Sequence, residues 1–359
     1  MTPQDEIIIF GLSLSSSWGN GHATTFRALL RGLHAEGRRV LFLERRQPWY
    51  LDNQDLPDPD FCDLEFYDDI AQVTVRHADR LARAGAVIVG SYVPDGQALI
   101  DALHRMPLRQ LCFYDIDTPV TLDMLARGDE QHLARRQVPL FDCYLSFSGG
   151  RVLDRLRDDW GARNPVALYC SVDADAYRPM DVPTRWDLGY LGTYSPDRQP
   201  GLDALLVEPA RRLPQMRFVV AGSMFPGDID WPDNVDRIDH LPPERHAEFY
   251  NAQRFTLNIT RAAMRALGWS PSVRLFEAAA CGTPIISDRW PGLSDLLPEG
   301  RAITVADTTA EVVAALSGND ATAMAARARA IILGGHTGRA RARDLIDALA
   351  RQPHLTAGA

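Results

Sequence analysis

Residues 270–286 have the sequence Ser270-Pro271-Ser272-Val273-Arg274-Leu275-Phe276-Glu277-Ala278-Ala279-Ala280-Cys281-Gly282-Thr283-Pro284-Ile285-Ile286, which predicts a loop, a helix and a buried strand in succession. Ser270 or Ser272 can cap the start of the helix, because each side chain can accept a hydrogen bond from a free backbone amide. Gly282 favours the end of the helix, and Pro284 prevents its continuation. A helix that leads directly into a buried strand is typical of α/β proteins with parallel sheets.

The start of this helix combines groups that suit a nucleotide. Arg274 and Glu277 are three positions apart, so they share one face near the positive end of the helix dipole. Free amides and an arginine bind phosphate groups, and a carboxylate accepts hydrogen bonds from the hydroxyls of a ribose. An ordinary capped helix with an ion pair between Arg274 and Glu277 explains the same residues, and the sequence alone leaves both interpretations open.

The composition is that of a soluble enzyme with two domains. The chain has 359 residues, of which 46% are hydrophobic and 24% charged, and this length exceeds one ordinary core. The formal net charge of -9 argues against a nucleic-acid partner, which would need a basic face. The five cysteines form no Cys-x-x-Cys pair, as expected of reduced thiols in a cytoplasmic protein without a disulfide frame or a zinc site. The sequence also predicts no export signal and no transmembrane segment, because it lacks a long apolar run.

Short apolar strands alternate with helical patterns along both halves of the chain. The predicted strands are residues 7–11, 40–43, 86–89, 111–114 and 143–146 in the first half and 188–192, 217–222, 235–238, 255–259 and 285–286 in the second. Repeated βα units of this kind form parallel sheets covered by helices on both faces. The two blocks meet in a linker rich in aspartate and proline, residues 166–184, so we expect two doubly wound α/β domains that face each other across a cleft. Ligands of such sheets bind at the loops that follow the strands.

The loop after the first strand is rich in glycine and serine and leads into a helix. It contains Gly19, Asn20, Gly21 and His22, and its glycines let a ligand approach the backbone. His22 is a candidate base or a ligand of a sugar hydroxyl. A histidine that only hydrogen-bonds the helix start fits the same pattern.

A second loop in the first half carries two carboxylates. Asp115 and Asp117 have the spacing of a pair that chelates Mg²⁺ or Mn²⁺ together with a diphosphate. The same residues fit a helix cap, since Asp117 directly precedes Thr118 and Pro119. We favour a cap that leaves one carboxylate for a ligand over a metal site.

Two loops of the second half supply positive charge. Gly192 permits close approach, the hydroxyl of Thr193 can donate to a phosphate, and Arg198 brings a guanidinium to the same loop. Arg261 follows another strand, shortly before the helix that begins near Val273. It is either a third cationic group of the site or a partner in a surface salt bridge.

Together these features resemble the GT-B glycosyltransferases, and more narrowly the CgeB-like (spore-maturation) glycosyltransferase-like group. The resemblance covers roughly residues 7–342. It rests on Trp18-Gly19-Asn20-Gly21-His22, on residues 113–119, on residues 191–199 and on the pattern Ser-x-Arg-x-x-Glu-Ala-x-Ala-Cys-Gly-x-Pro at 272–284.

The resemblance implies a domain plan and a reaction. The plan is a Rossmann-like acceptor domain over residues 1–168, a Rossmann-like donor domain over 169–335, and a helix in 336–359 that packs back on the first domain. The reaction is transfer of a sugar, of the hexosyl type, from a nucleoside-diphosphate sugar such as a UDP-sugar. The acceptor is unknown and could be a glycan, a protein, a lipid or a small molecule. Beyond the nucleotide sugar as co-substrate, the resemblance implies no cofactor and no metal.

The resemblance also implies roles for single residues. Glu277 would bind the ribose, and Arg198 and Arg274 the diphosphate. The remaining donor-binding residues would be Gly192, Thr193, His240, Leu241, Ser272 and Val273, with the base near His240 and Leu241. His22 and Asp117 would be catalytic, while Gly19, Asn20, Gly21, Thr118 and Arg261 would face the acceptor or the sugar.

The sequence departs from this family at one position. Many retaining members carry a glutamate eight positions before the ribose-binding one, and here that position is Trp269. The stereochemical outcome therefore stays open, and two other functions compete: a sugar-nucleotide epimerase or hydrolase on the same fold, and a non-catalytic binding or structural protein. An NAD-dependent oxidoreductase would need a Gly-x-Gly-x-x-Gly turn before an acidic residue such as Glu44, and the glycine spacing is wrong.

Overall fold

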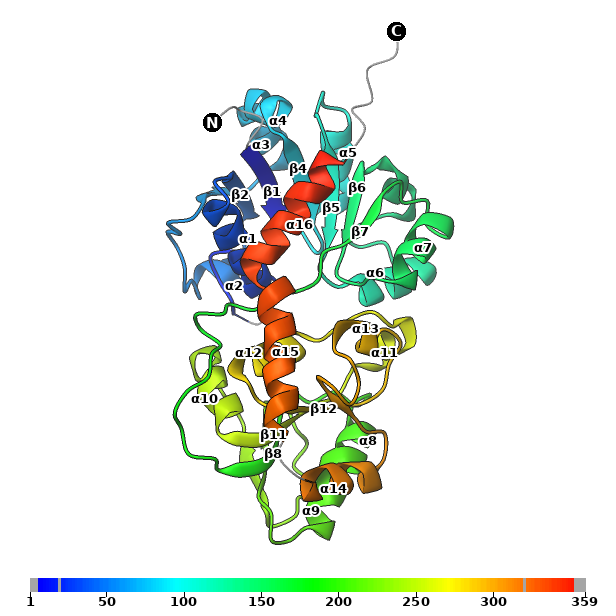
Figure 1. Ribbon diagram of the computed structural model, residues 1–359. Helices are drawn as coiled ribbons and strands as arrows, with labels where there is room; N and C mark the ends of the chain where they lie inside the picture. Colours follow the sequence, from blue (N-terminus) through cyan, green and yellow to red (C-terminus); the bar gives the residue numbers. More distant parts are fainter. Residues whose placement is uncertain (1–5, 19–20, 319–320, 352–359) are drawn as a thin grey trace. The chain divides into compact units, whose positions relative to one another are not determined.

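The computed structural model describes residues 6–18, 21–318 and 321–351. The chain divides into two units: the first consists of Met1–Ser171 and Gly338–Ala359, and the second of Val172–Thr337. In Figure 1 the last helix, drawn in red, lies with the blue and cyan elements of the first unit, although it follows the whole second unit in the sequence.

Among the described residues, the first unit forms a parallel sheet of seven strands in the order β3-β2-β1-β4-β5-β6-β7. The strands are β1 (Glu6–Gly11), β2 (Arg39–Arg45), β3 (Asp63–Tyr67), β4 (Ala86–Gly90), β5 (Leu111–Asp115), β6 (Cys143–Ser146) and β7 (Pro165–Ala167). Ile8 of β1 lies opposite Leu41 on one side and Val87 on the other. The strand order therefore reverses at β1, which marks the carboxyl ends of β1 and β4 as the edge where ligands bind in such sheets.

Helices cover this sheet and bury its apolar strands. They are α1 (His22–Ala35), α2 (Pro48–Leu51), α3 (Ile70–Arg76), α4 (Ala78–Arg83), α5 (Gly96–His104), α6 (Thr118–Ala126), the 3-10 helix η2 (Arg135–Leu140), α7 (Arg151–Asp158) and α16 (Gly338–Ala350). The central strands consist almost wholly of apolar residues because both faces of the sheet are covered.

Helix α16 packs on α1 at a crossing of glycines (Figure 1). A Cβ atom on Gly32 would lie 2.2 Å from the carbonyl oxygen of Gly338, and one on Gly338 would lie 2.2 Å from that of Ala28. Beyond the crossing, Leu345 joins the core of the first unit, and Glu36 accepts hydrogen bonds from arginines of α16. The two helix backbones are therefore in contact, with no room for side chains between them.

Among the described residues, the second unit forms a parallel sheet of six strands in the order β10-β9-β8-β11-β12-β13. The strands are β8 (Trp186–Leu191), β9 (Phe218–Ala221), β10 (Val235–Ile238), β11 (Gln253–Asn258), β12 (Ile285–Ser287) and β13 (Thr304–Val305). Its helices are α8 (Gln199–Leu202), the π-helical turn η3 (Asp203–Val207), α9 (Glu208–Arg212), η4 (Pro243–Arg245), α10 (His246–Asn251), α11 (Ala262–Leu267), α12 (Val273–Cys281), α13 (Leu293–Leu296), α14 (Thr309–Ser317) and α15 (Thr322–Gly335). The order reverses at β8, which pairs with β9 and β11, so the loops after β8 and β11 begin at the ligand-binding edge.

One expectation about the elements needs correction. The predicted linker at 166–184 begins inside β7, the edge strand of the first sheet, so the connection is shorter than predicted. The helix expected within residues 336–359 begins at Gly338 as α16, after α15 ends at Gly335.

The five cysteines all lie among the described residues, where none forms a disulfide, and four of them are buried. Among the described residues, none of the helices combines the length and the apolar character needed to cross a membrane.

Candidate functional site

Helix α12 begins and ends as the sequence predicts. Ser272 occupies the cap position, and its hydroxyl accepts a hydrogen bond from the amide of Arg274 at 3.4 Å. Gly282 closes the helix in the left-handed conformation, with φ of 78°. The apolar residues between them are buried, so the N-terminal turn, which includes Val273, is the part of α12 nearest to solvent.

Arg274 binds backbone and hydroxyl oxygens. Its Nε donates to the carbonyl of Leu191 at the end of β8, and its Nη1 donates to Ser272 Oγ at 3.2 Å. A Cβ on Gly192 would lie 3.0 Å from Arg274 Nη2, so a glycine at 192 makes room for this guanidinium. Among the described residues Arg274 and Glu277 form no ion pair, which removes the simple explanation of a salt-bridged surface helix.

Glu277 is a buried carboxylate held by a tyrosine. Its side chain is 7% exposed, and Tyr250 on α10 donates a hydrogen bond to its Oε2 at 3.0 Å. Burial and this carboxylate raise the pKa of Tyr250 well above its usual value, so the phenol keeps its proton and remains a donor. Tyr177, which precedes β8, also interacts with Glu277. Neither tyrosine was singled out from the sequence, because no local pattern links positions so far from Glu277.

Arg198 is a buried cation that forms no salt bridge among the described residues, although the neighbouring carboxylate of Asp197 acts on its charge. It is 5% exposed, and its Nη2 donates to the carbonyl of Thr193 at 2.6 Å. Its Nε is buried and meets no acceptor in the described part of the chain. Burial, with Arg274 and Arg261 nearby, lowers the pKa of Arg198. Three guanidinium groups thus gather after β8, after β11 and at the start of α12, an arrangement that attracts an anion.

The loops that follow β8 and β9 are joined through their backbones. Gly222 has φ of 148°, and a Cβ there would lie 2.1 Å from the carbonyl oxygen of Gly192. The amide of Gly192 donates to Ala221 at 2.8 Å, and that of Tyr194 donates to Ser223 at 2.9 Å. The glycines at 192 and 222 therefore allow the two loops to lie in contact beside Arg198.

The remaining predicted donor residues are more peripheral. Thr193 and His240 are exposed, and Leu241 is half-buried. The carbonyl of Leu241 lies 3.2 Å from Nε2 of His246, which fixes the turn between β10 and α10.

Trp269 occupies a strained position just before α12. Its φ is 44°, a left-handed conformation that is costly for a bulky residue. Its amide donates to Pro291 at 2.7 Å and its Nε1 to Asp295 at 2.8 Å, while a Cβ on Gly292 would collide with the indole ring. The indole is thus held by the loop after β12.

In the first unit, Glu44 holds the glycine- and serine-rich loop. The Glu44 carboxylate is 1% exposed and accepts hydrogen bonds from the amides of Leu14 at 2.7 Å and Ser15 at 2.9 Å. It also accepts from the hydroxyls of Ser13 and Ser15. Glu44 is therefore a structural anchor and is not available to bind a ribose, as an NAD-dependent enzyme would require.

His22 is the first residue of α1 and belongs to a cluster of rings. Its ring lies 5.5 Å from that of Tyr92, which lies 4.4 Å from that of His132. Burial and the neighbouring His132 lower the pKa of His22 to about 4, so the imidazole is neutral near pH 7. Gly21 caps α1 from an exposed position, whereas the predicted residues Gly19 and Asn20 lie outside the described residues.

The two aspartates after β5 have different environments. Asp115 is fully buried and accepts hydrogen bonds from Tyr144 and Thr121, each at 2.7 Å. Burial raises the pKa of Asp115 to about 6. Asp117 is half-buried at the cap position of α6, but its side chain makes no capping hydrogen bond. Asp117 thus occupies the expected cap position, but its side chain does not form the expected capping hydrogen bond.

Thr118 requires a correction. It was predicted to face the acceptor or the sugar, but it is fully buried. Its hydroxyl donates to the carbonyl of Asp115, lies 3.0 Å from that of Ser146 and accepts from the amide of Phe147. Thr118 therefore joins β5 and β6 and offers nothing to a ligand.

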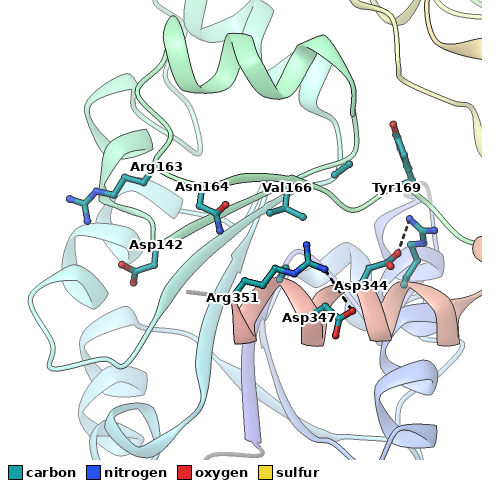
Figure 2. Close-up of a pocket in the computed structure, with 11 residues that line it drawn as sticks. Asp142, Arg163, Asn164, Val166, Tyr169, Asp344, Asp347 and Arg351 are labelled. Carbon is teal, nitrogen blue, oxygen red and sulfur yellow. Dashed lines mark ion pairs between the residues drawn. The ribbon is translucent and has the colours of Figure 1, made fainter. Parts of the chain in front are cut away.

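The described residues contain no cluster of three or more His, Cys, Asp or Glu side chains that could hold a metal ion. A pocket of about 580 Å³ lies in the first unit between α16 and the segment that includes β7 (Figure 2). Figure 2 shows two ion pairs on its α16 side, between Arg341 and Asp344 and between Arg351 and Asp347. Arg341 and Arg351 are thus neutralised by neighbouring carboxylates, in contrast to Arg198 and Arg274 of the second unit, which form no salt bridge among the described residues.

Comparisons with known proteins address the fold. Residues 198–347 match a family model described as glycosyl transferase-like. A search of curated proteins found no match in sequence. The chain is similar to the solved structure of sucrose-phosphate synthase from Thermosynechococcus elongatus, at 14% identity over 97% of this chain and 98% of that one, with a TM-score of 0.71. It is also similar to HepE of Anabaena in complex with UDP and glucose, at 13% identity, 96% and 99% coverage and a TM-score of 0.65.

A third similar structure is AviGT4, a glycosyltransferase involved in avilamycin A biosynthesis, at 16% identity, 99% and 98% coverage and a TM-score of 0.62. The narrower CgeB-like grouping stays a prediction. The two parallel-sheet units, the match over residues 198–347 and these structural likenesses together give the chain the fold of the GT-B glycosyltransferases.

Proposed function

We propose that the protein is a glycosyltransferase that takes a sugar from a nucleoside-diphosphate sugar, with UDP as the nucleotide to test first. The observation that carries the proposal is Arg198, a buried guanidinium that forms no salt bridge among the described residues and has two further arginines nearby. A buried cation needs a compensating anion, and a diphosphate supplies one. The similar HepE structure contains UDP and glucose.

The proposed donor site is built from the loops after β8 and β11 and from the start of α12. Arg198, Arg261 and Arg274 contact the diphosphate, helped by amides near Ser272 and Val273. Arg261 was expected to face the acceptor or the sugar. We assign it to the donor site because its positive charge lowers the pKa of Arg198, so the two groups lie near each other. Glu277, which accepts a hydrogen bond from Tyr250 through Oε2, also accepts hydrogen bonds from the ribose hydroxyls. The base lies near His240 and Leu241.

The proposed chemistry is stabilisation of the leaving diphosphate. Negative charge grows on the phosphate oxygens as the bond to the sugar breaks, and fixed guanidinium groups oppose that charge without a metal ion. In the first unit, His22 or Asp117 takes the proton from the acceptor hydroxyl if the reaction inverts the sugar configuration. The low pKa of His22 leaves its imidazole unprotonated near pH 7, as a base must be.

A non-catalytic nucleotide-sugar-binding protein is the second candidate, and Trp269 favours it. Position 269 carries an indole that is tied to Asp295, so this residue gives the donor sugar no carboxylate. The two candidates share the donor site and differ in turnover.

The experiment begins with calorimetric titration of UDP, GDP, dTDP, ADP and CDP into the full chain. Binding of one of them, followed by release of that nucleotide from its sugar conjugate, supports a transferase or hydrolase. Acceptor-dependent acceleration of the release identifies the transferase. Binding without release across glycan, lipid and small-molecule acceptors supports the non-catalytic protein, and failure of all five nucleotides to bind would overturn both candidates.

A further inference from the structure

Arg237 on β10 is a half-buried cation that the sequence did not single out. Its guanidinium carbon lies 4.3 Å from the ring centroid of Phe225 and 4.6 Å from that of Trp231. The side chain is 20% exposed, and its nearest carboxylate, Asp239, lies 3.8 Å away and is itself almost fully exposed. Two aromatic faces therefore offset much of the cost of removing this charge from water.

Arg237 also fixes the backbone at the end of the neighbouring strand. Its Nη1 donates to the carbonyl of Val220 at 2.9 Å, and its Nη2 lies 3.4 Å from the carbonyl of Gly222. Both carbonyls belong to the carboxyl end of β9, where the chain enters the 222–231 loop. Phe225 and Trp231 belong to the same loop. The Arg237 side chain therefore contacts the beginning of the loop at Gly222, its middle at Phe225 and its end at Trp231.

The 222–231 loop in turn supports the loop that carries Arg198. Gly222 is in backbone contact with Gly192, and the amide of Tyr194 donates to Ser223 at 2.9 Å. Tyr194 also packs its ring 5.6 Å from that of Phe225. Arg198 donates to Thr193, in the middle of this stretch. A shift of the 222–231 loop would therefore move the carbonyl on which the Arg198 guanidinium rests.

We propose that Arg237 is a positioning residue for the nucleoside-diphosphate site: it sets the 222–231 loop against the 192–199 loop and so fixes Arg198. This inference rests on the proposed function, because it assumes that the site takes a nucleoside diphosphate. Arg237 itself does not touch the ligand, since its faces are covered by Phe225 and Trp231 and its Nη atoms are turned to carbonyls. An arginine suits this role because its planar fork can stack on rings and bind two carbonyls at once, which a lysine cannot do.

The second unit contains a matched control at the amino ends of the strands of the same sheet. Arg254, near the start of β11, donates to the carbonyls of Leu316 at 2.8 Å and Gly318 at 3.0 Å. Its guanidinium carbon lies 5.4 Å from the ring centroid of Phe255. Arg254 thus makes the same kinds of contact as Arg237, but at the amino ends of the strands, away from the loops that follow β8, β9 and β11.

The test compares Arg237→Met with Arg254→Met in the full chain. Each variant is titrated calorimetrically with UDP and with inorganic pyrophosphate, and its urea unfolding is measured without ligand. We expect both variants to be less stable than the native protein. Only Arg237→Met should also lose UDP affinity, by at least about tenfold, which is the lower end of the effect of removing a group that orients a ligand-binding residue. Arg237→Lys, which keeps the charge without the planar fork, should fail to restore that affinity.

The outcomes separate this inference from the function on which it rests. If the native protein binds UDP and Arg237→Met binds it within about twofold, the inference is wrong and the proposed function stands. Equal affinity losses in the two methionine variants would mean that Arg237 acts only through general stability, and this also overturns it. If the native protein binds none of the nucleoside diphosphates, the proposed function fails and the inference fails with it. Should Arg237→Met not fold, full UDP affinity in Arg237→Lys decides against the inference.

Discussion

The guanidinium of Arg274 donates hydrogen bonds to the carbonyl of Leu191 and to the hydroxyl of Ser272. Among the described residues it forms no salt bridge with a carboxylate. We predict that Arg274→Ala weakens UDP binding by about 1.5–3 kcal/mol, the range for a hydrogen bond to a charged group. Isothermal titration calorimetry measures this directly. The control is Arg211→Ala on α9, whose guanidinium pairs with Glu208 and Asp230 and should be dispensable for binding. Equal affinity in the native protein and in Arg274→Ala would remove Arg274 from the phosphate site.

Glu277 allows a test that separates ribose from phosphate. Glu277→Gln keeps the size of the side chain and an acceptor for Tyr250, but it removes the negative charge that attracts two ribose hydroxyls. We predict that this change lowers the affinity for UDP by about tenfold while leaving pyrophosphate binding within about twofold, since a charged acceptor contributes about 1.5 kcal/mol more than a neutral one. Parallel losses for both ligands would show that Glu277 acts on the diphosphate or on the fold.

His132 permits a prediction about pH. Burial lowers the pKa of His132 to about 4, below its value in the unfolded chain, and His22 shares this direction. The unfolded state therefore binds more protons than the folded state between about pH 6.5 and pH 4, and each histidine makes folding less favourable as pH falls through that window. Asp115 acts in the opposite sense, because its raised pKa favours the folded state at low pH.

A comparison of the native protein with His132→Phe isolates the contribution of His132 to the pH dependence of the free energy of unfolding. Phenylalanine does not titrate and can keep the ring contacts with Tyr92 and Phe113. We expect the free energy of unfolding of the variant to fall less steeply between pH 6.5 and pH 4, by up to about 1.4 kcal/mol per pH unit. Urea denaturation at four pH values measures this slope. Identical slopes in the two proteins would mean that His132 is protonated in the folded state as readily as in the unfolded chain.

At the scale of elements, the glycine crossing of α1 and α16 should tolerate no added atom. Gly32→Ala would place a methyl group 2.2 Å from the backbone oxygen of Gly338, and neither backbone can yield without moving its helix. We predict a loss of at least about 1–3 kcal/mol in unfolding free energy, the usual cost of overpacking. Gly334→Ala in α15 is the control, because a Cβ there meets nothing within 4 Å and alanine favours helix by about 1 kcal/mol. A stable Gly32→Ala variant would show that the crossing is looser than described.

The elements also show what the sequence can and cannot predict. The central strands are continuous apolar runs, so their pattern predicts them directly. The strands that the sequence analysis missed, β3, β7 and β13, all lie at sheet edges, where one side is unpaired and the side chains are mixed. Helix α12 was predicted from its cap, its glycine and its proline because all three signals are local.

The same division applies to the site residues. Arg198, Arg274 and Glu277 follow strands or caps and can be found by position in the chain. Tyr250, which fixes Glu277, and Arg237, which fixes the 222–231 loop, act across the fold, and only the folded structure reveals their partners. Thr118 was misjudged because a hydroxyl at a strand end can turn inward to join the neighbouring strand.

At the scale of the whole molecule, we predict that activity does not depend on a divalent metal. Three guanidinium groups can balance the charge of a diphosphate, and the buried Asp115 has both carboxylate oxygens engaged by hydroxyls. UDP release from UDP-sugar in excess EDTA should therefore equal that in buffer within about twofold. Loss of release in EDTA, with recovery on adding Mn²⁺, would return Asp117 to consideration as a metal ligand. Assays with Mg²⁺ alone complete the comparison.

The return of α16 to the first unit has a consequence for synthesis on the ribosome. Helix α1 emerges early, but the helix that covers it is made only after the entire second unit has been translated. The nascent first unit must wait with the surface around Ala28 and Gly32 uncovered, while Val172–Thr337 can already assemble its own sheet. The later-made unit can thus fold first, and the chain's earliest segment completes its core last. Premature termination before Gly338 would leave a finished second unit attached to a permanently open first one, a natural target for chaperones and proteases.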